Sequence, residues 1–282
     1  MLLLLLASQI LTTPIAKVDF KKIDEMSGIA KSRTFEDTYW VHNDSGDKAR
    51  IFAIHANGKS IKPSWDADYK GLRINGAKNV DWEDIALDGQ TLYISDLGNN
   101  GNKRQDLTIY VLPEPNPNTM TEATVTKTLR VKYPDQTAFP PTGKYTFDCE
   151  AIFVLHGKIF VISKDRLNRL LPATTATLYR LDTDFEDKVN VLTKVDSATG
   201  LRGWVTGADV SPDGKTLAVL THFPRPAVYT TSTSVANDQF FTAGKWVVRD
   251  FLNLGQCEAI CFENNSSMIV GNEGGSLFRV KV

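Results

Sequence analysis

The sequence is poor in the residues that build the most recognisable metal and redox sites. Of its 282 residues, three are cysteines and four are histidines. An odd cysteine count excludes a complete disulfide framework. Cys257 and Cys261 would lie about 13 Å apart on one extended strand, too far to bridge. The histidines stand singly rather than at the spacing of zinc ligands, which excludes a typical zinc site; they are His42, His55, His156 and His222.

The short motifs of several enzyme classes are also absent. The chain contains no G-x-S-x-G nucleophile elbow, no phosphate-binding P-loop, no C-x-x-C pair and no dinucleotide fingerprint. Nucleophilic serine catalysis therefore has no local support. The formal net charge is -1, so the overall charge gives no reason to expect nucleic acid or an acidic membrane surface as a partner.

The sequence has no apolar run long enough to cross a bilayer. Its most apolar stretch, residues 1–16, is too short for that and ends in a small residue, Ala16. These features are typical of a signal peptide, although no Lys or Arg precedes the apolar core. The alternative is a buried N-terminal strand or helix. On the first interpretation the protein is secreted or periplasmic, and residues 17–282 form a single domain.

Beyond these absences, the chain repeats one order of segments five times. A short segment headed by an acidic or hydroxyl residue is followed by an apolar run that ends in polar residues. The pairs are 27–30 with 40–44, 83–86 with 91–96, 150–153 with 160–164, 206–210 with 218–222, and 258–262 with 269–273.

A third element with an aromatic residue follows each pair. The aromatic positions recur at intervals of roughly 50 to 70 residues, and helical periodicity is almost absent; they are Phe52, Tyr110, Tyr179, Tyr229 and Phe278. Short β-rich repeats of this length predict propeller blades. We therefore expect an all-β, monomeric, five-bladed β-propeller built from four-stranded antiparallel blades.

The fourth strand of each blade is the weakest part of the pattern. We expect these strands near residues 71–77, 125–133, 188–194 and 245–251. The fifth blade has only three strands before the chain ends at Val282. We expect the segment Lys17–Ile23 to complete it, because closure of the ring removes exposed sheet edges.

Five residues head the first strands and should meet at one mouth of the central channel: Ser27, Glu83, Glu150, Thr206 and Glu258. Three carboxylates so close together need protonation or a cation. An all-oxygen set of varied reach suits calcium. The alternative is that the glutamates cap strand ends by binding backbone amides.

The second strands should return to the same mouth. We predict that residues at or near their ends, Asp44, Asp96, Lys164 and His222, line a catalytic site, with Lys164 and His222 as general acid or base. A basic collar and one further acid would bind an anionic ligand there; they are Arg50, Arg104, Arg166, Arg225 and Glu273. The alternative for the loop charges is an ordinary solvated surface.

Three motifs resemble a group of uncharacterised secreted bacterial β-propellers: Asp81–Ala86, Ser95–Asn100 and Thr206–Gly214. The residues that head the first strands also resemble those of the calcium-activated nucleotidases (the apyrase family). Those proteins are five-bladed propellers whose axial calcium is held by serine and glutamate. The resemblance implies an axial calcium held by Ser27, Glu83, Glu150 and Glu258, with Thr206 at the place of a second serine. The longer nucleotidase loops are not matched.

Two functions follow from this pattern. The first is a calcium-dependent hydrolase of a small anionic molecule such as a phosphate ester. The second is a non-enzymatic binding module in which an axial calcium ion is structural. The sequence leaves both open.

Overall fold

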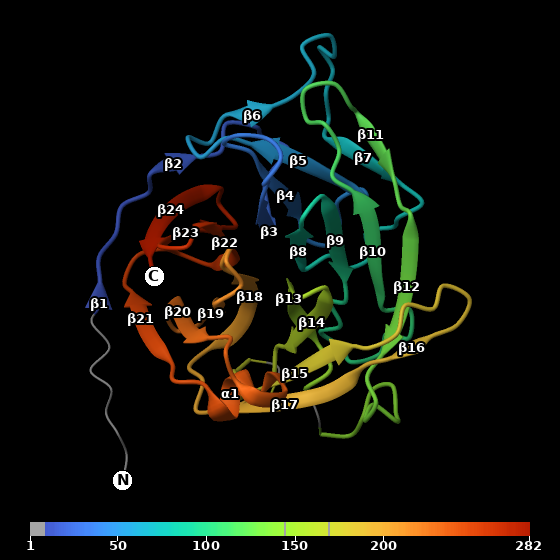
Figure 1. Cartoon of the computed structure of the whole chain (residues 1–282), viewed down its shortest axis with the longest axis vertical. Coiled ribbons are helices and arrows are strands. Elements are labelled where there is room, and N and C mark those ends of the chain that lie inside the picture. The colour runs from blue at the N-terminus through green and yellow to red at the C-terminus, as the bar shows by residue number, and fades with distance from the viewer. Residues whose placement is uncertain (1–8, 144, 169) are drawn as a thin grey trace.

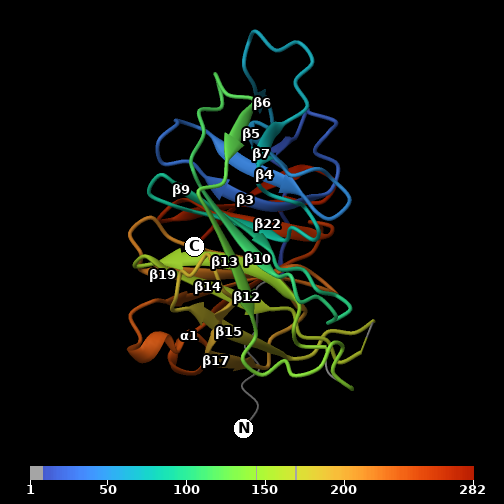
Figure 2. The ribbon, with the colours of Figure 1, turned by 90° about the vertical axis from the view of Figure 1, so that its right-hand side faces the viewer.

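Five β-sheets surround a common axis in the computed structural model, which describes residues 9–143, 145–168 and 170–282 (Figure 1). The expected five-bladed propeller is confirmed. Each sheet is one blade, and the blades are numbered here in chain order from blade one. Figure 2 shows the ring from the side, with β5, β6 and β7 at one end and α1 and β17 at the other.

The first strand of each blade lies nearest the axis and contacts the first strands of the two neighbouring blades, so the inner strands form a closed ring. These strands are β3 (Met26–Lys31), β8 (Asp84–Asp88), β13 (Cys149–Leu155), β18 (Trp204–Val210) and β22 (Cys257–Asn264). The second strands are β4 (Tyr39–Asn43), β9 (Thr91–Asp96), β14 (Lys158–Ser163), β19 (Thr216–His222) and β23 (Ser267–Asn272). The third are β5 (Arg50–Ile54), β10 (Thr108–Pro113), β15 (Thr175–Leu181), β20 (Ala227–Ser232) and β24 (Ser276–Lys281). The outermost are β7 (Leu72–Asn75), β12 (Lys127–Lys132), β17 (Thr193–Thr199), β21 (Val247–Phe251) and β2 (Ala16–Lys17).

The hydrophobic core lies between blades rather than at the centre. Each of the five blade interfaces has its own cluster of buried apolar side chains. The repeated aromatic residues of the third strands are all buried, as the repeat predicts. Alternating strand residues thus pack one sheet face to face against the next, and the axis is left to polar groups.

An N-terminal strand closes the ring, as expected. β2 pairs antiparallel with β24, with Ala16 opposite Leu277. The hydrogen bonds extend beyond it, since the amides of Ile15 and Val18 donate to the carbonyls of Leu277 and Gly275 at 2.8 Å each. The strand is shorter than the predicted span of residues 17–23 and begins one residue earlier. A cluster of apolar side chains from blades one and five fills the interface behind it.

A segment between the third and fourth strands of each blade reaches back to the outer strand of the preceding blade; we call this segment the staple. β11 (Glu122–Thr124) and β16 (Asn190–Val191) pair parallel with β7 and β12. In blade four the staple is η1 (Ala236–Asp238) with α1 (Phe240–Ala243). It packs on β17, and the Phe241 and Thr242 amides donate to Asp196 Oδ2 at 2.7 and 3.0 Å.

The two remaining staples lie at the closure. β1 (Gln9–Ile10) precedes β2 and pairs parallel with β21 of blade four. The loop of blade one that leads to β6 (Ser60–Ile61) contacts blade five, where the Asp19 amide donates to the Gly58 carbonyl at 3.0 Å. Figure 1 shows β1 beside β21 and β2 beside β24.

The expectation for the fourth strand of blade three was wrong. The predicted span, residues 188–194, contains the staple β16, whereas the fourth strand is Thr193–Thr199. A staple and an edge strand carry the same apolar pattern, so the sequence did not distinguish them.

The expected signal peptide spans the edge of the described chain. Its residues 1–8 lie outside the described residues, Gln9–Ile10 form β1, and Ala16 belongs to β2. None of the helices that the structure describes has the length and hydropathy needed to cross a membrane.

Candidate metal centre

A β-bulge at the head of the first strand carries the expected axial residue in four blades. In blade three, Cys149 pairs with Ser163 and Ala151 with Ile162, which leaves Glu150 as the extra residue. The same shift isolates Ser27, Thr206 and Glu258. A bulge re-aims a side chain away from the strand's normal alternation. Glu83 precedes β8, with its amide donating to the Ser95 carbonyl at 3.0 Å.

The structure brings two of these five residues, Glu83 and Glu150, together with other acids, and the other three make separate contacts. The Ser27 hydroxyl donates to the Glu83 carbonyl at 2.9 Å, and the Thr206 hydroxyl donates to the Cys257 carbonyl at 2.8 Å. Both hydroxyls therefore join one blade to the next. Glu258 accepts a 3.0 Å hydrogen bond from Gln256 Nε2.

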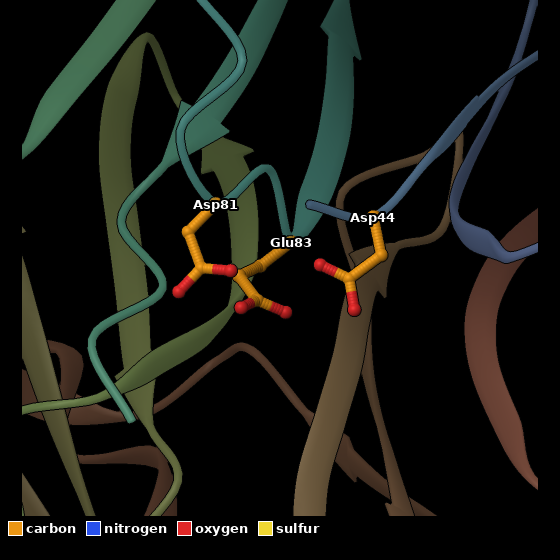
Figure 3. Close-up of side chains that lie close together, drawn as sticks. All are labelled: Asp44, Asp81 and Glu83. Carbon is orange, nitrogen blue, oxygen red and sulfur yellow. The ribbon is translucent and has the colours of Figure 1, made fainter. Parts of the chain in front are cut away.

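The structure instead gathers five carboxylates from blades one, two and three into two triads that share Glu83. Asp44, Asp81 and Glu83 form the first triad, and Glu83, Asp148 and Glu150 form the second. In each triad one ligand atom from every residue lies within 4.8 Å of the others. Figure 3 shows the side chains of the first triad pointing toward one another.

The first triad makes no ion pair within the described part of the chain, and the charges of Lys164 and Arg104 offset the burial of Glu83 and Asp81 only in part. Glu83 is 3% exposed, and its carboxylate makes no hydrogen bond or ion pair with any residue that the structure describes. Burial, followed by repulsion from Glu150 and Asp148, raises the pKa of Glu83 well above its ordinary value. Burial and the charge of Asp44 raise the pKa of Asp81 to about 6. A buried, ionised carboxylate without a partner is costly, so these acids either keep a proton or can hold a metal ion.

The second triad is largely compensated by protein groups. Lys164 Nζ lies 2.7 Å from Glu150 Oε1, and Arg166 lies 3.2 Å from Asp148 Oδ2. The Asn99 amide also donates to Asp148 Oδ1 at 2.6 Å. Burial still raises the pKa of Glu150 to about 8. Ionisation of all five carboxylates would therefore leave three negative charges beyond those of the two contacting cations.

The loop after β9 fixes the acids of the first triad. Asp96, at its start, accepts a 2.9 Å hydrogen bond from the Asp81 amide and pairs with Arg104 at 2.9 Å. The Gly98 amide donates to the Asp81 carbonyl at 3.1 Å. A Cβ on Gly98 would overlap Glu83 Oε1 and come within 2.5 Å of Asp81 Oδ2. Asp96 and Arg104 therefore position the acid cluster rather than face open solvent.

Of the other predicted site residues, His222 and Arg166 border the acid cluster. Arg166 Cζ and Lys164 Nζ lie 5.6 and 5.8 Å from the Trp204 ring, and Trp204 pairs with His222 across β18 and β19. His222 Nδ1 is buried without a hydrogen bond in the described structure, and burial and then Lys164 lower the pKa of His222.

Arg50 and Arg225 make no ion pair with the clustered acids in the described structure, whereas Glu273 lies within reach of the charge of Asp44, a member of the first triad. Arg50 contacts Asp47 and stacks over Phe52. Arg225 is exposed in the loop after β19. Glu273 shares the amide of Gln256 with Glu258, and burial followed by the charge of Glu258 raises the pKa of Glu273 to about 7.

Asp81 and Asp148 were not predicted from the sequence as members of the cluster. Both stand two residues before a predicted axial glutamate, in the triplets Asp81-Trp82-Glu83 and Asp148-Cys149-Glu150. The same triplet in adjacent blades was the pattern that could have identified them.

The donor set fits a hard divalent cation. The cluster offers only carboxylate oxygens, and residues two apart supply ligands of different reach. Calcium accepts six to eight oxygens in flexible geometry, whereas magnesium needs a near-ideal octahedron. The structure shows a buried acid cluster that can hold a metal ion.

The chain matches no protein-family model and no curated protein. Among solved structures, hydrazine synthase from Kuenenia stuttgartiensis is 13% identical with a TM-score of 0.47, covering 91% of this chain and 71% of that one. A gluconolactonase from Xanthomonas campestris is 16% identical with a TM-score of 0.43, covering 95% and 78%. U3-55K is 11% identical with a TM-score of 0.44, covering 91% and 68%. None of these similarities assigns the chain to a family.

Proposed function

We propose that the protein is a calcium-dependent hydrolase of a small anionic substrate, with phosphate esters as the substrate class. The observation that carries this proposal is Glu83, a buried carboxylate without a partner between two triads of acids. Asp44, Asp81 and Glu83 would hold the ion. When bound, calcium supplies positive charge that neutralises a phosphoryl group and polarises its oxygens.

The residues beside the cluster supply the remaining chemistry. Arg166 and Lys164 place two cations next to the acids, which favours an anionic substrate at this mouth. The lowered pKa keeps His222 neutral at pH 7, so its unpaired Nδ1 can accept a proton from an attacking water. Asp96 holds the Asp81 backbone through its side chain and acts as a positioning residue.

A structural ion without catalysis is a second candidate, because the acids come from three blades. Asp44 belongs to blade one, Asp81 and Glu83 to blade two, and Asp148 and Glu150 to blade three. A cation between them would fasten these blades whether or not a substrate is turned over. The protein would then be a binding module.

Calcium titration tests the metal site. After chelator treatment the full chain should bind calcium, and Glu83→Gln should weaken the affinity by about 100-fold, because it removes one charged ligand. Glu258→Gln is the matched control. Glu258 is an equally placed buried glutamate that lies outside both triads, so this variant should bind like the unchanged protein. Equal losses in the two variants would contradict the proposed site.

Turnover separates the two functions. Aryl phosphate monoesters and diesters, with carboxylic esters for comparison, are assayed in calcium and in chelator. Calcium-dependent release of the aryl alcohol from the phosphate esters, lost in Glu83→Gln and reduced in His222→Ala, is expected. Calcium binding without turnover of any phosphate ester would reject the hydrolase and leave the structural ion.

A further inference from the structure

The two triads share Glu83 but differ in their partners. The second triad contacts Lys164 and Arg166 through Glu150 and Asp148. The first triad contacts no such cation among the described residues, although Glu83, 3% exposed, points into it (Figure 3). Two sets of acidic ligands that share one carboxylate, that of Glu83, form the arrangement expected of a site for two cations.

Lys164 is held in this cluster by both its backbone and its side chain. Its amide donates to the Asp148 carbonyl at 2.7 Å, and its Nζ lies 2.7 Å from Glu150 Oε1. The Trp204 ring stands 5.8 Å from Nζ. The side chain is only 11% exposed, so little room is left for it to swing into solvent. Burial alone would lower the pKa of Lys164, but the attraction of Glu150, Asp148 and Glu83 raises it, which keeps the ammonium charged.

The Lys164 ammonium and a metal ion cannot both contact Glu150 at this position. Calcium binds carboxylate oxygens at about 2.3–2.6 Å, close to the distance at which Lys164 already contacts Glu150. Two cations so close would repel strongly. Lysine is also a compact point charge, which suits it to replace a spherical ion.

We propose that Lys164 takes the place of a second metal ion in the second triad and limits the acid cluster to one divalent cation, bound in the first triad. This inference rests on the metal site of the proposed function. It identifies Lys164 as the residue that determines how many ions the protein binds.

The test counts calcium ions by native mass spectrometry and calorimetry on the full chain. The unchanged protein should bind one ion, and Lys164→Gln, which removes the charge at similar length, should bind two. Lys164→Arg keeps the charge and should bind one. Lys158→Gln is the matched control, because it removes a half-exposed lysine from β14 of the same blade; it should also bind one.

A second variant, Glu150→Gln, tests which triad binds the ion and leaves Lys164 unchanged. Glu150→Gln should still bind one ion, because the three acids of the first triad are intact. This result does not depend on whether Lys164→Gln folds. Loss of the ion in Glu150→Gln would show that the metal lies in the second triad and would overturn the inference.

The remaining outcomes separate this inference from the proposed function. Two ions in the unchanged protein, or one in a folded Lys164→Gln, would overturn the role of Lys164. No ion in the unchanged protein but one in Lys164→Gln would reject the proposed metal site and support the displacement by lysine. No ion in either protein would reject both.

Discussion

The missing side chain of Gly98 lets the loop after β9 lie directly against the acid cluster. The main chain of this residue binds Asp81 and Arg104, while its Cα faces the oxygens of Glu83 and Asp81. Any side chain would push these carboxylates out of place. At the scale of single residues, the candidate cation site thus depends on the lack of a Cβ at Gly98 as well as on the acids.

Gly98→Ala is expected to weaken calcium binding by about tenfold, because groups behind the ligands fix their orientation. Gly101→Ala in the same loop is the control, since a Cβ there meets its nearest atom, on Lys103, at 3.7 Å. Calorimetric titration of both variants measures the difference. Equal affinities in the two would show that the loop does not hold the acids in place.

The sequence predicted two members of the first triad, Asp44 and Glu83, but not Asp81. It identified positions that repeat in every blade, whereas the position of Asp81 is acidic in only some of them: Glu25 and Asp148 correspond to it in blades one and three, but Trp204 and Gln256 stand there in blades four and five. Ser27 and Thr206 occupy the repeated axial position in blades one and four, but their hydroxyls donate to backbone carbonyls of the next blade. A repeat reports what all blades share, whereas a site on the axis depends on how they differ.

At the scale of strands, the sequence predicted the inner three of each blade well and the outer ones less well. The inner strands carry apolar residues on both faces, which pack against the two neighbouring blades. The outer strands are short and meet staples of similar composition, so β16 was included in the predicted fourth strand. Pairing across blades is a property of the assembled ring, and local patterns do not contain it.

Val18→Pro tests the closure by β2. Proline removes the amide that donates to the Gly275 carbonyl, and one lost hydrogen bond costs about 1 kcal/mol. We expect a melting temperature about 2–4 °C below that of Val18→Ala, which loses the same packing but keeps the amide. Calorimetry measures both variants. Identical melting temperatures would show that closure depends on the apolar interface alone.

At the scale of the whole molecule, the uncompensated acids make stability depend on pH and on calcium. Burial raises the pKa of Glu150 from 4.5 to about 8 in the folded protein. The folded state therefore holds this proton more tightly than the unfolded state, and stability falls as pH rises toward 8. His42 and His222 act in the opposite direction below pH 6.5, because burial lowers their pKa.

In chelator, the melting temperature is therefore expected to fall by a few degrees between pH 6.5 and pH 8, the interval that these pKa values define. Calcium bound in the first triad should lessen the decline, because its positive charge favours the ionised form of the neighbouring Glu150. Glu150→Gln should flatten it in chelator. Thermal melts over this interval provide the measurement, and a metal-free melting temperature that rises with pH would contradict the electrostatic account.

The staples of blades two to four each cover the blade that precedes them in the chain, and this order matters during synthesis of the chain. Proteins fold from the N-terminus as they leave the ribosome, and an exposed sheet edge is prone to aggregate. Each blade from two to four carries the segment that covers the outer strand of the blade synthesised before it. A nascent chain would thus shield its own edges one blade at a time. Blade four takes its staple, and blade five its outer strand, from the N-terminal segment, and Ala16 and Lys17 wait for a partner strand, β24, at the other end of the ring.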